Sequence, residues 1–416
     1  MLLHIALIPF LTLVGLPVVS GYPGWEKQLN EIMARQTDGH DEFDSFELLG
    51  DLITLPDASL TPVGKDIKSI LVGDGEPQST VSWTRPSLSS TQCKQDTCCV
   101  WDYIKDDMVQ AFRSVSGRCN GLARAAVRLG FHDAGAWSKD TASQGGGADG
   151  SICLNNEISA SQNRGLENIV KKMQSWYKKW NVQLGYKQVT YADLIQMGAT
   201  VATVVCPLGP RVKSYVGRKD SSFTNHFELL PSPFDSADFL IELFKNKTIF
   251  PHGLTALVGA HTTSQQFFVD TKRAGDPQDS SPGVWDLTFY NQTLFPQSAP
   301  PRVFMFQSDL ALSQHPSTKP EWVKFTTDRD DWNEDYSREY IRLSLLGVNN
   351  INNLTECTKV LPAAITDPNF KPTDASLIAQ WLQTTTHSTI SMQIAQLLDS
   401  GGLILQSLIN LLLGIL

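Results

Sequence analysis

The chain has 416 residues, 41% of them hydrophobic, so it can bury a sizeable core in one large domain or two ordinary ones. It carries 34 basic and 43 acidic residues, a formal net charge of -9, with no dense lysine or arginine run that could follow a phosphate backbone. This composition excludes a small disulfide scaffold and argues against nucleic acid as a partner.

The first twenty residues predict a signal peptide. An apolar run from Ile5 to Val19 ends in small residues, although the charged part before it is weak. A membrane anchor is the alternative, but Pro9 and Pro17 break a run that is already short for a span. We therefore expect a secreted, extracellular protein without a membrane partner. Three Asn-x-Thr sequons fit an exported glycoprotein: Asn246, Asn291 and Asn353.

Residues 21–92 are mixed in character, with acidic stretches, several prolines and glycines, and no sustained pattern. They predict a loosely structured extension or pro-segment. From residue 93 onward, apolar residues recur at helical spacing between connectors rich in glycine and proline, and no run of alternating strands occurs, so the fold class is mostly α. Thr190 is a plausible N-cap. The clearest predicted helices are Ala111–Ala136, Leu166–Trp180, Tyr191–Val204, Ser236–Phe244 and Leu254–Phe268.

The chain ends in a C-terminal extension, residues 363–416, whose last sixteen residues are almost wholly apolar. A packed or interfacial terminal helix is the favoured interpretation. A lipid-anchor signal is the alternative, but it requires a polar spacer, and Gly401-Gly402 runs straight into Leu403.

Seven cysteines indicate an oxidising compartment, which would pair six and leave one over. A zinc site is the competing use, but Cys98-Cys99 is not accompanied by ligands at zinc spacing. The cysteines are Cys93, Cys98, Cys99, Cys119, Cys153, Cys206 and Cys357.

Arg128 and His132 are four residues apart in a predicted helix and therefore project from the same face. A neutral imidazole beside a fixed cation suits peroxide chemistry, because the imidazole can move a proton while the guanidinium stabilises developing charge. Glu157 or Asn163 could orient His132 through its second ring nitrogen. A surface arginine beside a core histidine is the plainer alternative for an isolated pair.

A flexible loop after this helix, Gly145 to Ser151, carries oxygen ligands at alternate positions. Together with Asp133 it could hold a hard cation such as calcium. The loop does not fit the EF-hand pattern, and a glycine-rich loop alone often means only a turn.

A second histidine, His261, ends an apolar segment in which Gly259 and Ala260 would let a flat group lie close by. It is a candidate axial ligand of a haem iron, and Asp309 could accept a hydrogen bond from its other nitrogen. A core histidine is the alternative. An oxygen-rich segment, Asp279 to Asp286, could form a second calcium site with Thr262.

Taken in order, these motifs resemble those of the class II fungal secretory haem peroxidases of the plant peroxidase superfamily, over residues 93–362. The resemblance implies a plant-peroxidase-like helical fold with one haem b between a distal and a proximal half, and two calcium ions. It places His132 and Arg128 on the distal side with Asn163 and Glu157 behind them. His261 becomes the iron ligand, with Asp309 as its partner. The implied ligands of the first calcium ion are Asp133, Gly147, Asp149 and Ser151, and those of the second are Thr262, Asp279, Ser281, Val284 and Asp286.

The resemblance also implies the disulfides Cys119–Cys206, Cys98–Cys357 and Cys93–Cys99, although partners among Cys93, Cys98 and Cys99 could be exchanged. It leaves Cys153 as the free thiol, a small buried hydrophobe.

Several positions depart from the family pattern. Manganese-oxidising members carry acidic residues where this chain has Gly121, Ala125 and Phe267, and ligninolytic members carry a surface tryptophan where it has Ala256. Gln278 replaces a residue that is commonly aromatic, which puts the redox tuning of the proximal side in question.

We therefore expect a monomeric, haem-dependent peroxidase that reduces hydrogen peroxide and oxidises phenolic or other small organic donors by one-electron steps. A secreted calcium- and haem-binding protein with little turnover is the alternative from another class. A metal-dependent hydrolase using His132, Asp133 and His261 is more remote, because it lacks a compact three-ligand motif.

Overall fold

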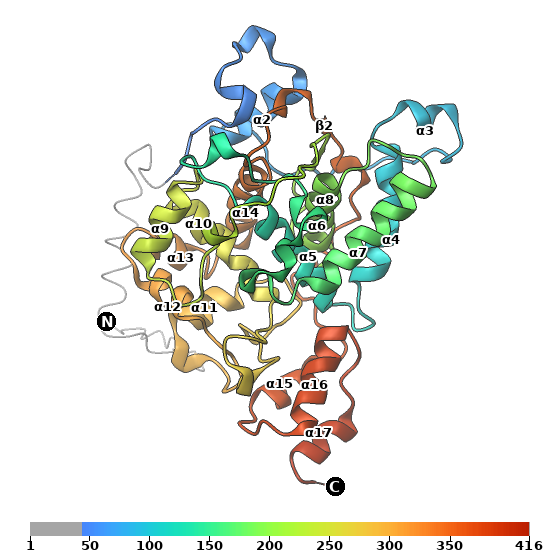
Figure 1. The fold of residues 1–416 in the computed structure, drawn as a ribbon. Helices are drawn as coiled ribbons and strands as arrows, with labels where there is room; N and C mark the ends of the chain where they lie inside the picture. Colours follow the sequence, from blue (N-terminus) through green and yellow to red (C-terminus); the bar gives the residue numbers. More distant parts are fainter. Residues whose placement is uncertain (1–43, 416) are drawn as a thin grey trace, which may run out of the picture. The chain divides into compact units, whose positions relative to one another are not determined.

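The structure, a computed structural model, describes residues 44–415. The predictions made for residues 1–43, the signal peptide among them, lie outside the described residues. The mostly α class is confirmed (Figure 1). In residues 44–415 the only strands are β1 (Tyr215–Val216) and β2 (Thr355–Glu356), an antiparallel pair. The α-helices are α2 (Pro62–Leu71), α3 (Thr91–Gln95), α4 (Cys99–Phe112), α5 (Gly121–Ala134), α6 (Ser151–Leu154), α7 (Glu167–Tyr177), α8 (Tyr191–Val205), α9 (Ala237–Lys245), α10 (Pro251–Val258), α11 (Thr288–Leu294), α12 (Gln307–Gln314), α13 (Lys319–Lys324), α14 (Arg329–Leu343), α15 (Ala375–Leu382), α16 (Thr389–Ser400) and α17 (Gln406–Leu412).

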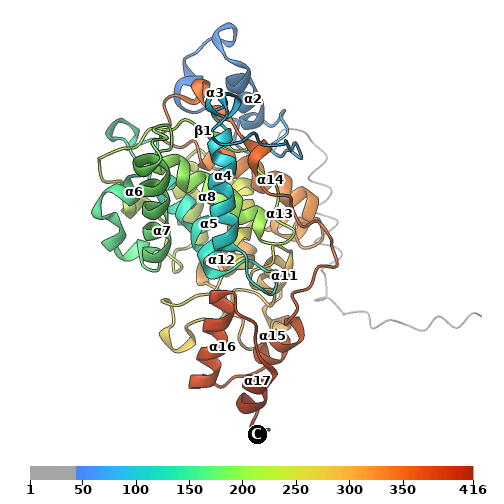
Figure 2. The ribbon, with the colours of Figure 1, turned by 90° about the vertical axis from the view of Figure 1, so that its right-hand side faces the viewer.

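Helix α8 lies in the main hydrophobic core, and all its residues after Tyr191 are buried. The predicted cap is confirmed, because the Thr190 hydroxyl accepts a hydrogen bond from the backbone N–H of Asp193. Helix α5 packs on α8 (Figure 2). Gly130 permits this close approach, since a Cβ there would lie 2.7 Å from the Cβ of Ala199. The contact leaves another face of α5 free for a functional site.

Two predicted helices are interrupted in the structure. The predicted helix Ala111–Ala136 is wrong as one element: α4 ends at Phe112, and α5 begins at Gly121 after Asn120 caps it. The predicted helix Leu254–Phe268 ends at Val258 and continues as a 3-10 turn, Gly259–Thr263. Its chain then leaves the helical path because Gln265 forms a bridge with Pro277. Each break depends on a contact between segments that a local pattern does not show.

Residues 44–92 are packed against the rest of the chain, so their predicted loose structure is wrong. Ile67 and Ile70 of α2 are fully buried in the main core. The buried guanidinium of Arg342, in α14, donates hydrogen bonds to the carbonyl oxygens of Ser45, Glu47 and Leu71. The apolar residues of this segment are too sparse to form a pattern in the sequence. They are enough to hold the segment in place, because they pack on an apolar surface that the larger core already provides.

Helices α15 to α17 lie together and share a separate small core around Trp381, Leu398 and Ile409 (Figure 1). Two ionic contacts join this C-terminal unit to the rest: the buried pair of Arg118 with Asp374, and the contact of Arg124 with the half-exposed Asp399, at 2.8 Å. The apolar end of the chain is therefore partly helical and anchored through polar groups.

The structure contains three disulfides, and they are the pairs that the resemblance implies: Cys93–Cys99, Cys98–Cys357 and Cys119–Cys206. Cys153 is free and buried, and burial raises the pKa of its thiol well above the usual value. A thiol in this state is unreactive.

Candidate active site

Helix α5 carries the first pair of site residues. The Nε–H of Arg128 donates a hydrogen bond to Nε2 of His132 at 3.1 Å, as expected for residues one helical turn apart. Nδ1 of His132 lies 2.8 Å from Oδ1 of Asn163. Because Asn163 Oδ1 can only accept, the network assigns the ring proton to Nδ1 and leaves the lone pair on Nε2.

Burial and the neighbouring guanidinium of Arg128 both hold the pKa of His132 well below its usual value. The imidazole is therefore neutral at physiological pH. Burial also lowers the pKa of Arg128, to about 10, and this residue stays charged. The pair consists of a neutral base beside a cation, the combination that the sequence predicted.

Asn163 and Glu157 are both near this pair, but they play different parts. The amide of Asn163 donates to the backbone carbonyl of Glu157, and the carboxylate of Glu157 instead accepts from the backbone N–H of Asn225. Of the two residues considered for orienting His132, Asn163 makes the contact. Asn225 was not anticipated, and nothing in the sequence around it indicates this role.

His261 lies in the 3-10 turn after α10, and its Nδ1 is 3.1 Å from Oδ2 of the buried Asp309 in α12. The amide of Gln278 donates to the same carboxylate oxygen at 3.2 Å. The rings of Phe289 and Phe306 lie nearly perpendicular to the imidazole, with ring centroids 5.6 Å from it. Nδ1 is thus tied to a carboxylate while Nε2 remains available, so this imidazole could hold a haem iron through Nε2.

The predicted ligands of the first calcium ion come together at the end of α5. Oδ1 of Asp133 and Oγ of Ser151 are buried and have no hydrogen-bond partner among the described residues. Burial, aided by the nearby Asp149, raises the pKa of Asp133 well above its usual value, and burial raises that of Asp149 to about 6. Gly147, with φ of 105°, provides the turn. Crowded carboxylates with an unsatisfied oxygen fit a divalent cation.

The predicted ligands of the second calcium ion also lie together. The hydroxyl of Thr262 donates to Asp279 at 2.6 Å, and that of Ser281 donates to Asp286 at 2.9 Å. Burial raises the pKa of both carboxyl groups, and their mutual repulsion adds to the effect at Asp279. The carbonyl of Val284 lies 3.5 Å from the Thr262 hydroxyl. This donor set also fits calcium.

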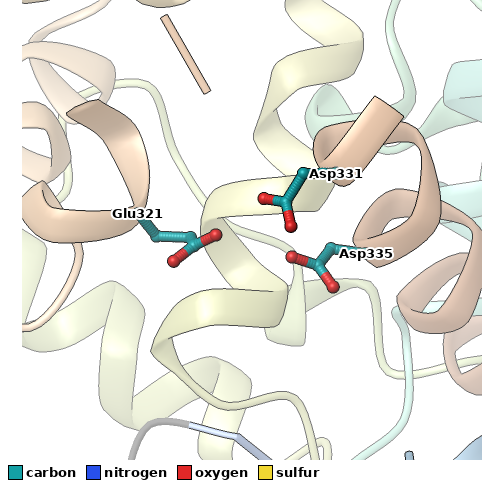
Figure 3. Close-up of side chains that lie close together, drawn as sticks. All are labelled: Glu321, Asp331 and Asp335. Atoms are coloured by element: carbon teal, nitrogen blue, oxygen red, sulfur yellow. The ribbon is translucent and has the colours of Figure 1, made fainter. Parts of the chain in front are cut away.

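A third acidic group, Glu321, Asp331 and Asp335, was not predicted (Figure 3). The Nζ of Lys324 lies 2.8 Å from Oδ2 of Asp331 and 3.4 Å from Oε1 of Glu321. Burial raises the pKa of Asp335 to about 8, with the charges of the two neighbouring carboxylates adding to the shift. The ammonium group of Lys324 therefore already balances part of the negative charge of this cluster, in the place where a metal ion would otherwise do so.

A model of the family described as peroxidase matches residues 104–328 of the chain, which is more than half of its length. The chain belongs to the peroxidase family. It is therefore an oxidoreductase that acts on a peroxide, and membership implies a haem cofactor.

Its relatives include fungal peroxidases and ligninases. A peroxidase of Arthromyces ramosus and another of Coprinopsis cinerea are each 29% identical over 306 residues, which cover 69% of this chain and 81% of the relative. Ligninase C of Trametes versicolor is 30% identical over 288 residues, covering 64% of this chain and 75% of the relative.

Within residues 44–415, no helix combines the length and apolar character needed to cross a membrane.

Proposed function

We propose that the chain is a secreted haem peroxidase that reduces hydrogen peroxide and oxidises phenolic and other small organic donors one electron at a time. The observation that carries this proposal is that two histidines, His132 and His261, have different hydrogen-bond partners suited to different roles. The Nε2 of His132 carries no proton and accepts a hydrogen bond from Nε of Arg128, and His261 is tied to Asp309 through Nδ1. A disulfide-bonded chain fits export, with residues 1–20 removed as a signal peptide. Residues 93–362 would form the peroxidase domain.

The bound haem b supplies the redox chemistry, and His261 would hold it through Nε2. The polypeptide supplies proton transfer and charge. In the proposed mechanism, Nε2 of His132 would take a proton from one oxygen of peroxide and return it to the other, departing oxygen. Asn163 fixes the required tautomer, and the guanidinium of Arg128 stabilises the negative charge that develops on the departing oxygen.

Two calcium ions would hold the segments that carry the histidines. The ligands Asp133 and Thr262 are each adjacent in sequence to a site histidine, so each ion would anchor one side of the haem. Their buried carboxyl groups support the proposal, because in an empty site they would have to bind protons instead.

The departures from the family pattern argue against a manganese site and a surface tryptophan route. The carboxylate that packs against Gly121 belongs to Asp399, which is already paired with Arg124. Ala256 is buried and carries no oxidisable ring. These positions favour small organic donors.

The test is His132→Leu, compared with His315→Leu as a matched change outside the site. We expect His132→Leu to bind haem but to slow the first spectral change after peroxide addition by about 10²- to 10⁴-fold, the usual contribution of a positioned acid-base group. His315→Leu should react like the wild type. A normal rate in His132→Leu would remove this residue from the mechanism.

A further inference from the structure

A cavity of about 210 Å³ lies between the start of α14, the turn after α8 and the segment around Ser79. Its lining residues include Arg211, Arg329 and Asn333, and also the acidic Asp330. Nε of Arg211 is buried and has no hydrogen-bond partner among the described residues. Leu208, also in the lining, has a φ of 74°, a strained value for a residue with a side chain. Nη2 of Arg211 already donates to the carbonyls of Val81, Thr358 and Leu361, so Arg329 is the arginine of the lining whose charge remains available.

A pair of tryptophans lies directly behind this cavity. The carboxamide oxygen of Asn333 accepts a hydrogen bond from Nε1 of Trp285 at 3.0 Å. Trp285 is fully buried and stacks on Trp332, with ring centroids 5.1 Å apart and planes inclined by only 6°. One residue of the cavity lining thus contacts the first ring of a stacked indole pair.

The second indole reaches the helix end that carries His261. Nε1 of Trp332 donates to the carbonyl of Ala256 at 3.0 Å. A Cβ at Gly259, two residues before His261, would lie 2.6 Å from that nitrogen, so the absence of a side chain there permits the approach. The ring of Tyr290 is 5.4 Å from Trp332. Phe289, 5.5 Å from Tyr290 and 5.6 Å from His261, completes a continuous aromatic contact.

We propose that the cavity is a second donor site, for aromatic carboxylates, and that Trp285 and Trp332 carry electrons from it toward His261. The proposal rests on the proposed peroxidase function. Arg329 would bind the carboxylate, since guanidinium groups form strong charge-assisted hydrogen bonds with such anions. The volume of about 210 Å³ is below that of sites for drug-sized ligands, about 300–1,000 Å³, and suits a single ring.

The electron balance is simple. Reduction of one hydrogen peroxide to two waters consumes two electrons and two protons. Two phenolic donors supply them in turn, and each loses one electron from its ring and one proton from its hydroxyl to solvent. Each electron passes through the indoles singly, so neither tryptophan changes overall. The indole N–H groups donate to neutral oxygen acceptors, of Asn333 and Ala256, which stabilises the transient positive charge.

This route differs from the one that the ligninolytic members of the family use, which starts at a surface tryptophan in the position of Ala256. At Ala256 no indole is present, but the carbonyl of the same residue holds Trp332. The electron path would therefore approach His261 through α14 and the buried core. Electron tunnelling falls steeply with distance, and rings in van der Waals contact are the favourable case.

The first experiment compares two donors that share a methoxyphenol ring, ferulate with a carboxylate and 2-methoxyphenol without one. Trp332→Phe should lower kcat/KM for ferulate by about tenfold or more and leave 2-methoxyphenol within about twofold. Arg329→Gln should raise KM for ferulate by roughly 10-fold or more, the effect of losing a charged hydrogen bond. Trp101→Phe is the matched control, because the Nε1 of this buried indole has no hydrogen-bond partner within residues 44–415.

The second experiment does not depend on turnover. Calorimetry should show ferulate binding to the wild type and weaker binding to Arg329→Gln. After peroxide addition without a donor, a radical trap should label Trp285 or Trp332, as located by peptide mass mapping. Equal ferulate kinetics in Trp332→Phe and the wild type, or labels only elsewhere, would refute the route. If the wild type oxidised neither donor, the proposed peroxidase function would fail, and ferulate binding would still test the cavity.

Discussion

Gln278 donates a hydrogen bond to the same oxygen of Asp309 that faces the imidazole of His261. Asp309 is buried, so each hydrogen bond that it accepts reduces the negative charge it can share with the histidine. The hydroxyl of Ser264 in turn donates to Gln278 and orients its amide. Gln278 is therefore part of the hydrogen-bond network that holds His261.

The first prediction follows from this contact. Gln278→Met should remove one donor from Asp309, strengthen its interaction with His261 and make the haem reduction potential more negative, as a potentiometric titration can measure. Gln292→Met is a control that leaves Asp309 untouched, since Gln292 bonds to Ser280. An unchanged or more positive potential in Gln278→Met would contradict the argument.

The second prediction concerns the tautomer of His132. Asn163→Val removes the acceptor that holds the proton on Nδ1, so part of the population should present an Nε2–H, which cannot act as a base. We expect the peroxide reaction to slow by about 10-fold or more, less than in His132→Leu. Stopped-flow kinetics measure it. Asn163→Asp, which keeps an acceptor, should recover most of the rate, and failure to do so would count against the tautomer role.

The third prediction concerns calcium removal and pH. In calcium-free protein the pKa of Asp149 is about 6, above its unfolded value, so the folded state binds this proton more tightly. Stability is therefore greatest below about pH 4 for this group and is lost as the pH rises through 6, by up to about 3 kcal/mol. Urea unfolding with a chelator should show the loss, and added calcium should abolish it. A chelated protein whose stability does not change between pH 4 and 7 would exclude the site.

The fourth prediction concerns the C-terminal unit. Asp374→Ala leaves the guanidinium of Arg118 buried without its carboxylate, which should cost about 3–5 kcal/mol of unfolding free energy. Calorimetric unfolding measures the change, and Asp367→Ala, at an exposed position, is the control. The double change Arg118→Met with Asp374→Leu should recover much of the loss, because it removes both charges. No recovery would show that the unit depends on packing rather than on this pair.

The fifth prediction concerns which of the Asn-x-Thr sequons carries a glycan. Asn353 is exposed, whereas the amide of Asn291 donates to the carbonyls of Leu287 and Thr326. A glycan replaces an amide hydrogen, so at Asn291 it would break a native hydrogen bond. In protein secreted from a eukaryotic host, Asn353→Gln should therefore remove a glycan mass and Asn291→Gln should not. Mass spectrometry before and after deglycosylation decides it, and a glycan found at Asn291 would contradict the prediction.

Sequence alone was enough for features set by local geometry. The helical period places Arg128 and His132 on one face whatever the rest of the chain does, and Thr190 caps α8 through a contact three residues away. The helical class likewise follows from apolar spacing over many residues. These inferences need only neighbours along the chain.

The tertiary structure alone decided which distant groups meet. Asn225 bonds to Glu157, and Gln278 bonds to Asp309, across segments with no shared pattern. The stacking of Trp285 on Trp332 and the packing of residues 44–92 arise in the same way. Such contacts depend on how the core brings segments together, and a single polar or aromatic residue in a loop has no periodicity from which its partner could be predicted.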